Sequence, residues 1–248
     1  IFHPRMDFML LAVDPIVNQA ANWSYMFGGK ASTPVVIRAV INRGGEQAAQ
    51  HSQAVQAMFM HIPGLKVVMP STAYDAKGLL IAAVNDGNPV LYIDDRWLYE
   101  ELGEVPEDMY ETPIGKAAIR RQGRDLTIVA TSYMASQASR AAESLAEEGI
   151  DAEVIDLRTL KPWDRETVFQ SVEKTGRLII SDAAWKTAGA AAEIAASVCE
   201  EAFHFLKCPI VRVCLPDLPA PMSRPLEAAY YIHSGDIIKA ARSTLSSS

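Results

Sequence analysis

Short apolar runs alternate with amphipathic segments along the first half of the chain. The runs at 34–40, 65–69 and 90–93 are rich in β-branched residues and have the length of buried strands. Before and between these runs, apolar residues recur every three or four positions, which is helical spacing. Helices are therefore expected at 12–25, at 53–62 and at 72–84.

Prolines and polar residues mark where these helices begin. Pro15 fits a first helical turn, where its missing N–H costs nothing. Ser52 is expected to cap a helix that begins at Gln53. The inward face of that helix is expected to consist of Val55, Met58 and Phe59. Thr72 and Asp75 have the spacing of a capping box, which supports the next helix.

The second half of the chain repeats this alternation more regularly. Strands are expected at 126–130, 152–157, 178–181 and 210–215. Helices are expected at 134–148, from an Asp164 cap to Gly176, at 189–205 and at 234–245. Residues 216–225 contain four prolines, which indicates an ordered loop.

Residues 95–113 separate the two halves. They are acidic, contain Pro106 and Pro113, and show little periodicity, which is typical of a linker between domains. On both sides of the linker, alternating strands and helices indicate parallel sheets with right-handed crossovers. We therefore predict an α/β protein with two doubly wound domains, 1–113 and 114–248.

Composition and charge narrow the classes of function. Apolar residues make up 49% of the 248 residues and charged residues 21%, which is a globular composition. A net charge of −7 without a run of Lys or Arg argues against nucleic-acid binding. No apolar run approaches the roughly 18 residues of a membrane span. The three cysteines form no CxxC pair, which disfavours zinc and suits a reducing compartment.

His51 is the strongest single candidate for chemistry. It follows a polar loop that contains Gly44 and Gly45, and it precedes the expected Ser52 cap. That position directs a side chain toward the end of a sheet, where α/β proteins bind ligands. An imidazole there can exchange a proton near neutral pH. The alternative is an ordinary loop histidine that hydrogen-bonds its own backbone.

A second candidate is the tight turn that follows the helix at 72–84. Asp86 and Asn88, together with free carbonyls at the helix end, could hold a hard cation, or they could form a simple Asx-turn. Arg158 and Asp182 follow strands, where an ion pair and a capping carboxylate are the favoured interpretations. The sequence contains no GxGxxG, P-loop or GxSxG motif, so these residues alone name no reaction.

The ordered set of motifs resembles one family. HSQ at 51–53, PGLKVVMPSTAYDAKGLL at 63–80 and DGNPV at 86–90 are similar to the beta chain of the thiamine diphosphate-dependent 2-oxo acid dehydrogenases, which are transketolase-like. The stretches 114–134 and 149–180 resemble the C-terminal domain of that family. The resemblance implies that 1–113 is an incomplete thiamine-pyrimidine-binding domain and that 114–248 is a transketolase C-terminal domain.

The resemblance also implies cofactors and partners. The family shares thiamine diphosphate between this kind of chain and an alpha chain, which holds the diphosphate and Mg²⁺ through a GDG…N motif that this sequence lacks. Further implied partners are a second beta chain, a lipoyl-bearing acyltransferase core and a 2-oxo acid such as pyruvate or a branched-chain analogue. The implied location is the cytoplasm, or the mitochondrial matrix if the source is eukaryotic.

Individual site residues follow from the same resemblance. His51 matches the family's active-site histidine, which assists proton transfer and hydrogen-bonds the substrate. Phe8 matches the aromatic residue that contacts the aminopyrimidine ring, although Arg5 stands where relatives usually have another aromatic residue. A structural potassium site is implied at the carbonyls of Val35, Ala83 and Val84 with the side chains of Asp86 and Asn88.

The catalytic glutamate of the family would lie upstream of Ile1. The first residue is not Met, so we expect that the N-terminal part of the domain is missing from this sequence. Two alternatives to the dehydrogenase subunit stay open at this point. One is half of a split transketolase-type enzyme, and the other is a non-catalytic module for dimerisation or for docking on a multienzyme core.

Overall fold

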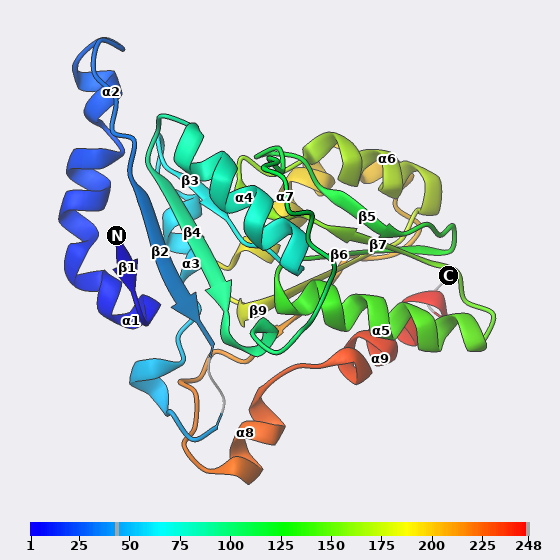
Figure 1. Ribbon diagram of the computed structural model, residues 1–248. Coiled ribbons are helices and arrows are strands. Elements are labelled where there is room, and N and C mark those ends of the chain that lie inside the picture. The colour runs from blue at the N-terminus through cyan, green and yellow to red at the C-terminus, as the bar shows by residue number, and fades with distance from the viewer. Residues whose placement is uncertain (43–44, 247–248) are drawn as a thin grey trace.

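Two five-stranded sheets form the framework of the protein (Figure 1). The structure is a computed structural model that describes residues 1–42 and 45–246. The first sheet has the order β1-β2-β4-β3-β8, with β1 at Phe2–His3, β2 at Val36–Ile41, β3 at Lys66–Val68, β4 at Val90–Asp95 and β8 at Thr159–Lys161. Its strands are parallel except for β8, which pairs with β3 in the antiparallel direction.

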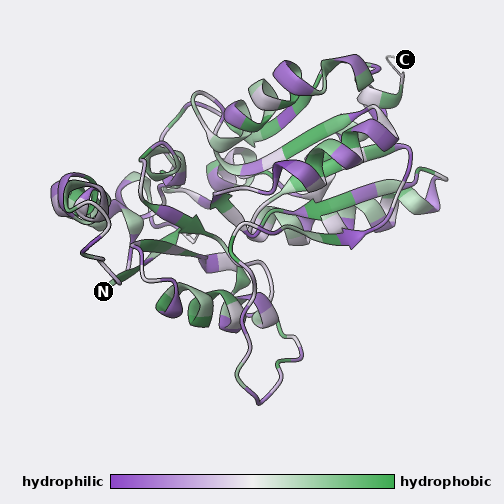
Figure 2. Ribbon diagram, turned by 90° about the horizontal axis from the view of Figure 1, so that it is seen from above, coloured by the Kyte–Doolittle hydropathy of each residue, from purple (hydrophilic) through white to green (hydrophobic). Residues whose placement is uncertain are grey.

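The second sheet has the order β10-β9-β6-β7-β5. Its strands are β5 at Ala118–Arg121, β6 at Leu126–Ala130, β7 at Ala152–Asp156, β9 at Leu178–Trp185 and β10 at Val211–Leu215. They are parallel except for β5, which pairs with β7 in the antiparallel direction. Figure 2 shows the strands of both sheets as largely hydrophobic, with helices of mixed polarity around them.

Helices cover both faces of each sheet. The first half contains α1 (Met6–Met9), η1 (Leu10–Ala12), the π-helix η2 (Pro15–Ala20), α2 (Trp23–Met26), η3 (Ala49–His51), α3 (Gln56–Met60), α4 (Ala73–Asn85) and η4 (Arg96–Leu98). The second half contains α5 (Tyr133–Glu147), α6 (Arg165–Thr175), α7 (Ala190–Glu201), η5 (Phe203–Phe205), α8 (Arg224–Tyr230) and α9 (Ser234–Ser246). No helix in the described ranges is long and apolar enough to cross a membrane.

One hydrophobic core runs through both halves of the chain. Alternate residues of β4 point to opposite faces, as in any strand. Tyr92 packs with α4 on one face of the first sheet, whereas Leu91 points to the other face, toward α1 and α3. The same core cluster continues into α6, α7 and the second sheet. The α3 helix, which begins at Gln56, is therefore held between the two sheets, and His51 lies in the segment that leads into it.

The sequence predicted most of these elements. The structure confirms the strands expected at 126–130, 152–157 and 210–215. It also confirms the caps formed by Thr72 and Asp164, because each of these side chains accepts a backbone N–H of the helix that follows it. The expected start of α3 is wrong, since the helix begins at Gln56 and not at Gln53. Met58, expected to face inward, is 52% exposed. The expected loop at 216–225 ends in the unpredicted helix α8.

Candidate active site

The structure brings the two predicted cofactor-facing residues together. The rings of Phe8 and His51 meet edge to face, with their centroids 5.2 Å apart. Phe8 lies on α1 and is 44% exposed, and His51 ends the short turn η3 beyond the carboxyl end of β2. Of the expected glycines before it, Gly45 lies in the loop with a φ of +70°, and Gly44 lies outside the described residues.

His51 lies in a segment fixed by side chains from other parts of the chain. We call residues 45–56 the histidine segment. On one side, Asp7 Oδ1 accepts the backbone N–H of Gln53 at 3.2 Å and its side-chain amide at 2.8 Å. On the other side, Asp182 Oδ1 on β9 accepts from the Gln56 side chain at 2.9 Å. These contacts replace the expected Ser52 cap and delay the start of the helix.

Several buried polar atoms around this segment have no partner among the described residues. They are Asp7 Oδ2, Asn42 Oδ1, Ser52 Oγ and Gln56 Oε1. Buried polar atoms in native proteins nearly always have a hydrogen-bond partner, and exceptions point to functional sites or bound molecules. Together with the exposed Phe8 ring, these atoms suit a polar heteroaromatic group such as an aminopyrimidine, which needs ring packing and hydrogen bonds at once.

Two buried carboxyls near the segment have perturbed acidities. Burial raises the pKa of Asp182 to about 6, opposed by the hydrogen bond from Gln56. Burial also raises the pKa of Asp95 to about 7, although Asn42 Nδ2 donates to it at 3.0 Å. Perturbed carboxyls concentrate at functional sites, but buried structural carboxyls share this property. The sequence indicated Asp182 from its place after a strand, with a capping carboxylate as the favoured interpretation. It did not single out Asp95, which ends the apolar strand β4.

The predicted potassium residues lie in the last turn of α4, in the turn that follows it and, for Val35, just before β2. Asp86 forms an ion pair with Lys66, and its Oδ1 accepts from the Asn88 side chain at 2.8 Å. The pKa of Asp86 is lowered by these hydrogen bonds, which outweigh the opposing effect of burial. The Val35 carbonyl accepts the N–H of Val90. The turn is therefore an Asx-turn, which was one of the two interpretations of the sequence. The Lys66 ammonium group lies at the Asp86 carboxylate.

Across the described residues, no three or more His, Cys, Asp or Glu side chains form a group able to hold a metal ion. At the turn, a cation would have to rely on the carbonyl oxygens of Val35, Ala83 and Val84. Ala83 and Val84 lie in the last turn of α4, where the carbonyls lack intrahelical partners and point beyond the end of the helix. The Asp86 carboxylate is paired with Lys66, so a cation would compete with that ammonium group for it.

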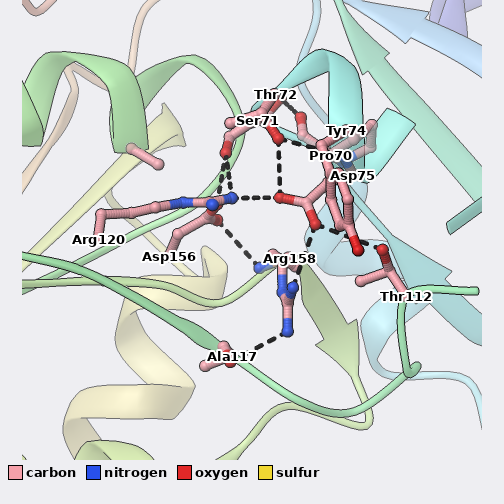
Figure 3. A network of polar contacts seen from close by, with 12 residues as sticks. Pro70, Ser71, Thr72, Tyr74, Asp75, Thr112, Ala117, Arg120, Asp156 and Arg158 are labelled. Atoms are coloured by element: carbon pink, nitrogen blue, oxygen red, sulfur yellow. Dashed lines mark hydrogen bonds and ion pairs between the residues drawn. The ribbon is translucent and has the colours of Figure 1, made fainter. Parts of the chain in front are cut away.

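Arg158 forms the ion pair that the sequence favoured. Its Nη1 donates to Asp75 Oδ1 at 3.1 Å, in a network that also contains Arg120, Asp156 and Ser71 (Figure 3). Asp75 comes from α4 beside the first sheet, and Arg120 and Asp156 come from the second sheet. The network thus joins the two halves of the chain, which is a structural role.

Comparisons with known proteins agree with this arrangement. The family described as transketolase, pyrimidine binding domain, matches residues 5–100. The family described as transketolase, C-terminal domain, matches residues 115–237. A solved structure titled split gene transketolase, inactive beta4 tetramer, has a TM-score of 0.79 at 25% identity and covers 99% of this chain and 75% of its own. The predicted fold class is confirmed.

Relatives of known activity are more similar in sequence. The beta subunit of acetoin:2,6-dichlorophenolindophenol oxidoreductase from Cupriavidus necator is 51% identical, over 97% of this chain and 71% of its own. The Bacillus subtilis protein of the same name is 47% identical, over 90% of this chain and 66% of its own. The beta subunit of the pyruvate dehydrogenase E1 component from Rhizobium meliloti is 43% identical.

The Rhizobium match covers 95% of this chain but only 52% of the relative, so the chain spans between about half and seven tenths of the length of these proteins. The resemblance seen in the motifs is confirmed by these identities and by both family matches. The chain belongs to the transketolase-like family, in which it stands beside the beta subunits of acetoin- and pyruvate-oxidising enzymes.

Proposed function

We propose that this chain is the beta subunit of a thiamine diphosphate-dependent enzyme that oxidatively decarboxylates a 2-oxo acid and transfers the acyl group to lipoamide. The observation that carries the proposal is the contact between the exposed Phe8 ring and the partly buried His51 ring, in a segment that also contains buried polar atoms without partners in the described chain. The identity of 42–51% to beta subunits with related activities supports it.

Two residues of this chain would act on the cofactor and the substrate. The Phe8 ring would pack against the aminopyrimidine ring and orient it. A ring nitrogen of His51 would donate a hydrogen bond to the carbonyl oxygen of the substrate and move a proton at that oxygen. When bound, thiamine diphosphate supplies the electron sink that allows a carbon–carbon bond beside a carbonyl group to break.

The remaining parts of the site would come from other chains. In this proposal an alpha chain holds Mg²⁺ and the diphosphate, a second beta chain completes the assembly, and a lipoyl-bearing acyltransferase core receives the acyl group. The relatives are named as beta subunits, and the solved neighbour is titled as a beta4 tetramer, which supports an assembly of several chains. Some relatives are named as mitochondrial, and we propose the cytoplasm or the mitochondrial matrix as the compartment.

Within the chain, we propose 1–113 as the pyrimidine-binding domain and 114–248 as the C-terminal domain. Strand β8, from the second of these ranges, pairs with β3 of the first sheet, so the domains also share a strand. We further propose a structural potassium ion at the end of α4. The carbonyls of Val35, Ala83 and Val84 would bind it, and Lys66 would compete with it for Asp86.

A second candidate substrate is acetoin. The two relatives named for acetoin share 51% and 47% identity with this chain, against 42–43% for the pyruvate dehydrogenase subunits. Acetoin has a carbonyl beside the bond to be broken, as a 2-oxo acid does, so the same Phe8 and His51 arrangement suits both substrates. The two candidates therefore differ in the leaving group and not in the chemistry expected of this chain.

The decisive experiment assembles the complete beta subunit with its alpha partner. Reduction of 2,6-dichlorophenolindophenol is then followed with pyruvate, branched-chain 2-oxo acids and acetoin as separate substrates. We expect dye reduction with one of these classes, dependent on thiamine diphosphate and Mg²⁺. Transfer of a two-carbon unit between sugar phosphates, with no dye reduction, would instead show the split transketolase alternative.

A further inference from the structure

Glu227 on α8 binds two consecutive backbone N–H groups at the start of the histidine segment. Its Oε2 accepts the N–H of Gly45 at 3.1 Å, and its Oε1 accepts the N–H of Glu46 at 2.9 Å. Glu227 is only 7% exposed. Hydrogen bonds to a charged acceptor are stronger than neutral ones, and two of them from one carboxylate fix both position and direction. The segment is therefore held at its beginning by the opposite end of the chain.

The backbone that Glu227 holds is conformationally unfavourable. Glu46 and Ala48 have φ values of +66° and +56°, in the left-handed region that residues with a side chain seldom adopt. Such conformations persist only where surrounding contacts impose them. The carbonyl of Ala48 in turn accepts the N–H of His51 at 3.4 Å. Contacts that fix the backbone of this loop therefore also fix the position of the His51 backbone and the direction of its imidazole.

The helix α8 is itself anchored to both halves of the chain. The hydroxyl of Tyr230 accepts from Trp185 Nε1 on β9 at 3.0 Å and donates to the Leu218 carbonyl at 2.9 Å. The ring of Tyr231 meets the Trp97 ring, just after β4, edge to face at 4.6 Å. In Figure 1, α8 lies beside the light-blue segment that precedes α3. A continuous set of contacts thus runs from the second sheet to the histidine segment.

We propose that Glu227 is a positioning residue for His51, through which the C-terminal half of the chain sets the geometry of the site. Glu227 acts on the loop and not on the substrate. The catalytic consequence rests on the function proposed above, whereas the positioning itself is a property of this chain alone. Loss of the two hydrogen bonds would release the loop to other backbone conformations, and His51 would lose its fixed approach to the reacting groups.

The chain offers a matched control on the same helix. Arg224 Nε lies 3.4 Å from Glu46 Oε2, and both side chains are largely in solvent, at 81% and 46% exposed. Exposed pairs of this kind contribute little. Arg224→Ala removes a contact between α8 and the same loop but leaves both hydrogen bonds of Glu227. This variant therefore separates the effect of the Glu227 hydrogen bonds from the effect of the other contacts between α8 and the loop.

The experiment compares Glu227→Ala, Glu227→Gln and Arg224→Ala in the complete subunit. Hydrogen exchange of the peptides that cover 45–56 and the NMR signal of the His51 imidazole, assigned with His51→Gln, report the positioning. For Glu227→Ala we expect exchange faster by about tenfold or more and a displaced imidazole signal. In the assembled enzyme we expect kcat to fall by about ten- to a hundredfold with little change in KM. Glu227→Gln, which keeps one acceptor oxygen, should be intermediate.

Unchanged exchange and an unchanged His51 signal in Glu227→Ala would overturn the proposal, as would an equal effect of Arg224→Ala. If Glu227→Ala fails to fold, Glu227→Gln decides whether Glu227 positions His51, because it keeps the size of the side chain but loses the negative charge and one of the two acceptor oxygens. If the wild-type assembly acts on no tested substrate, the proposed function fails. The exchange and NMR measurements would still decide whether Glu227 positions His51.

Discussion

The ring of Phe8 stands at 90° to the ring of His51, with centroids 5.2 Å apart. An edge-to-face pair of this kind contributes about 0.5–1.5 kcal/mol beyond the burial of its surface. Phe8 is therefore placed to do two things at once, since it offers an exposed aromatic surface and limits the rotation of the imidazole. The two residues belong to different elements, and their contact joins α1 to the histidine segment.

His51→Gln is expected to reduce turnover without unfolding the subunit. Glutamine can still donate a hydrogen bond but cannot exchange a proton near neutral pH, and general acid–base catalysis contributes about 10²- to 10⁴-fold. We expect a loss of kcat in that range, measured by dye reduction in the assembled enzyme. The exposed His204 provides the control, since His204→Gln should leave kcat unchanged. Equal activity of both variants would exclude His51 from proton transfer.

Phe8→Ala is expected to weaken cofactor binding more than turnover. Loss of one aromatic contact should raise the Kd for thiamine diphosphate by about three- to tenfold, corresponding to about 0.5–1.5 kcal/mol. Titration calorimetry on the assembled enzyme measures this directly. Phe203 lies on η5 and is 68% exposed, so Phe203→Ala is the matched control. An unaltered Kd in Phe8→Ala would place the pyrimidine ring elsewhere.

Asp95 is expected to make the protein less stable as the pH rises toward neutrality. Burial raises its pKa to about 7 in the folded chain from an ordinary value of 3.8, and Asp94 adds to the effect. Below about pH 4 the carboxyl is protonated in both states and causes no penalty. Between about pH 4 and pH 7 the unfolded chain loses the proton first, so the free energy of unfolding falls, by an amount on the order of 2–4 kcal/mol.

Asp95→Asn should remove this part of the pH dependence. The buried Oδ1 of Asn42 has no partner among the described residues, so the Asn42 side chain can turn its oxygen toward the new amide group. Urea unfolding at pH 5 and pH 8 should therefore show a smaller difference for the variant than for the wild type. Asp108→Asn, in the exposed loop, is the control and should keep the wild-type difference. Parallel pH profiles for wild type and Asp95→Asn would refute the prediction.

The sequence predicted the elements whose stability is local. The caps of α4 and α6 were recognisable, because Thr72 and Asp164 lie a few residues from the N–H groups that they accept. The start of α3 was not recognisable, because its limits are set by Asp7 and Asp182 from distant parts of the chain. A helix pattern alone cannot show that a remote carboxylate has replaced a local cap.

The candidate site was predictable in part for the same reason. His51 was found from its place after a polar loop, but only the family resemblance indicated Phe8, and no spacing rule connects the two residues. Glu227 was not found, because it contacts Gly45 across 182 positions of the chain. The edge strands β5 and β8 were also missed, since they are short and depend on neighbouring strands for their hydrogen bonds.

Potassium is expected to stabilise the chain if the proposed cation site exists. A ligand at ten times its Kd adds about 1.4 kcal/mol to the free energy of unfolding. The Tm should then be higher in KCl than in tetramethylammonium chloride at the same ionic strength. Lys66→Met removes the ammonium that pairs with Asp86 and should increase the response to potassium. Identical Tm values in the two salts, for both wild type and variant, would exclude a potassium site and show that the turn is a simple Asx-turn.

The strongest single effect on stability is expected from Arg120. Its guanidinium pairs with Asp156 at 2.6 Å and also with Asp75, and both carboxylates are fully buried (Figure 3). Removal of one partner from a buried ion pair costs about 3–5 kcal/mol, because the other charge stays buried without compensation. Arg120→Met should lower the free energy of urea unfolding by that amount. Arg242→Met, which removes an exposed pair with Glu148, should leave the free energy of unfolding almost unchanged.

A companion variant tests the cause of this loss. In Arg120→Met the uncompensated charge is that of Asp156, because Asp75 keeps its ion pair with Arg158. Asp156→Asn, added to Arg120→Met, removes this charge, so the double variant should recover part of the lost stability. If the double variant is less stable than Arg120→Met alone, packing or hydrogen bonds, and not buried charge, hold the two halves together at this junction.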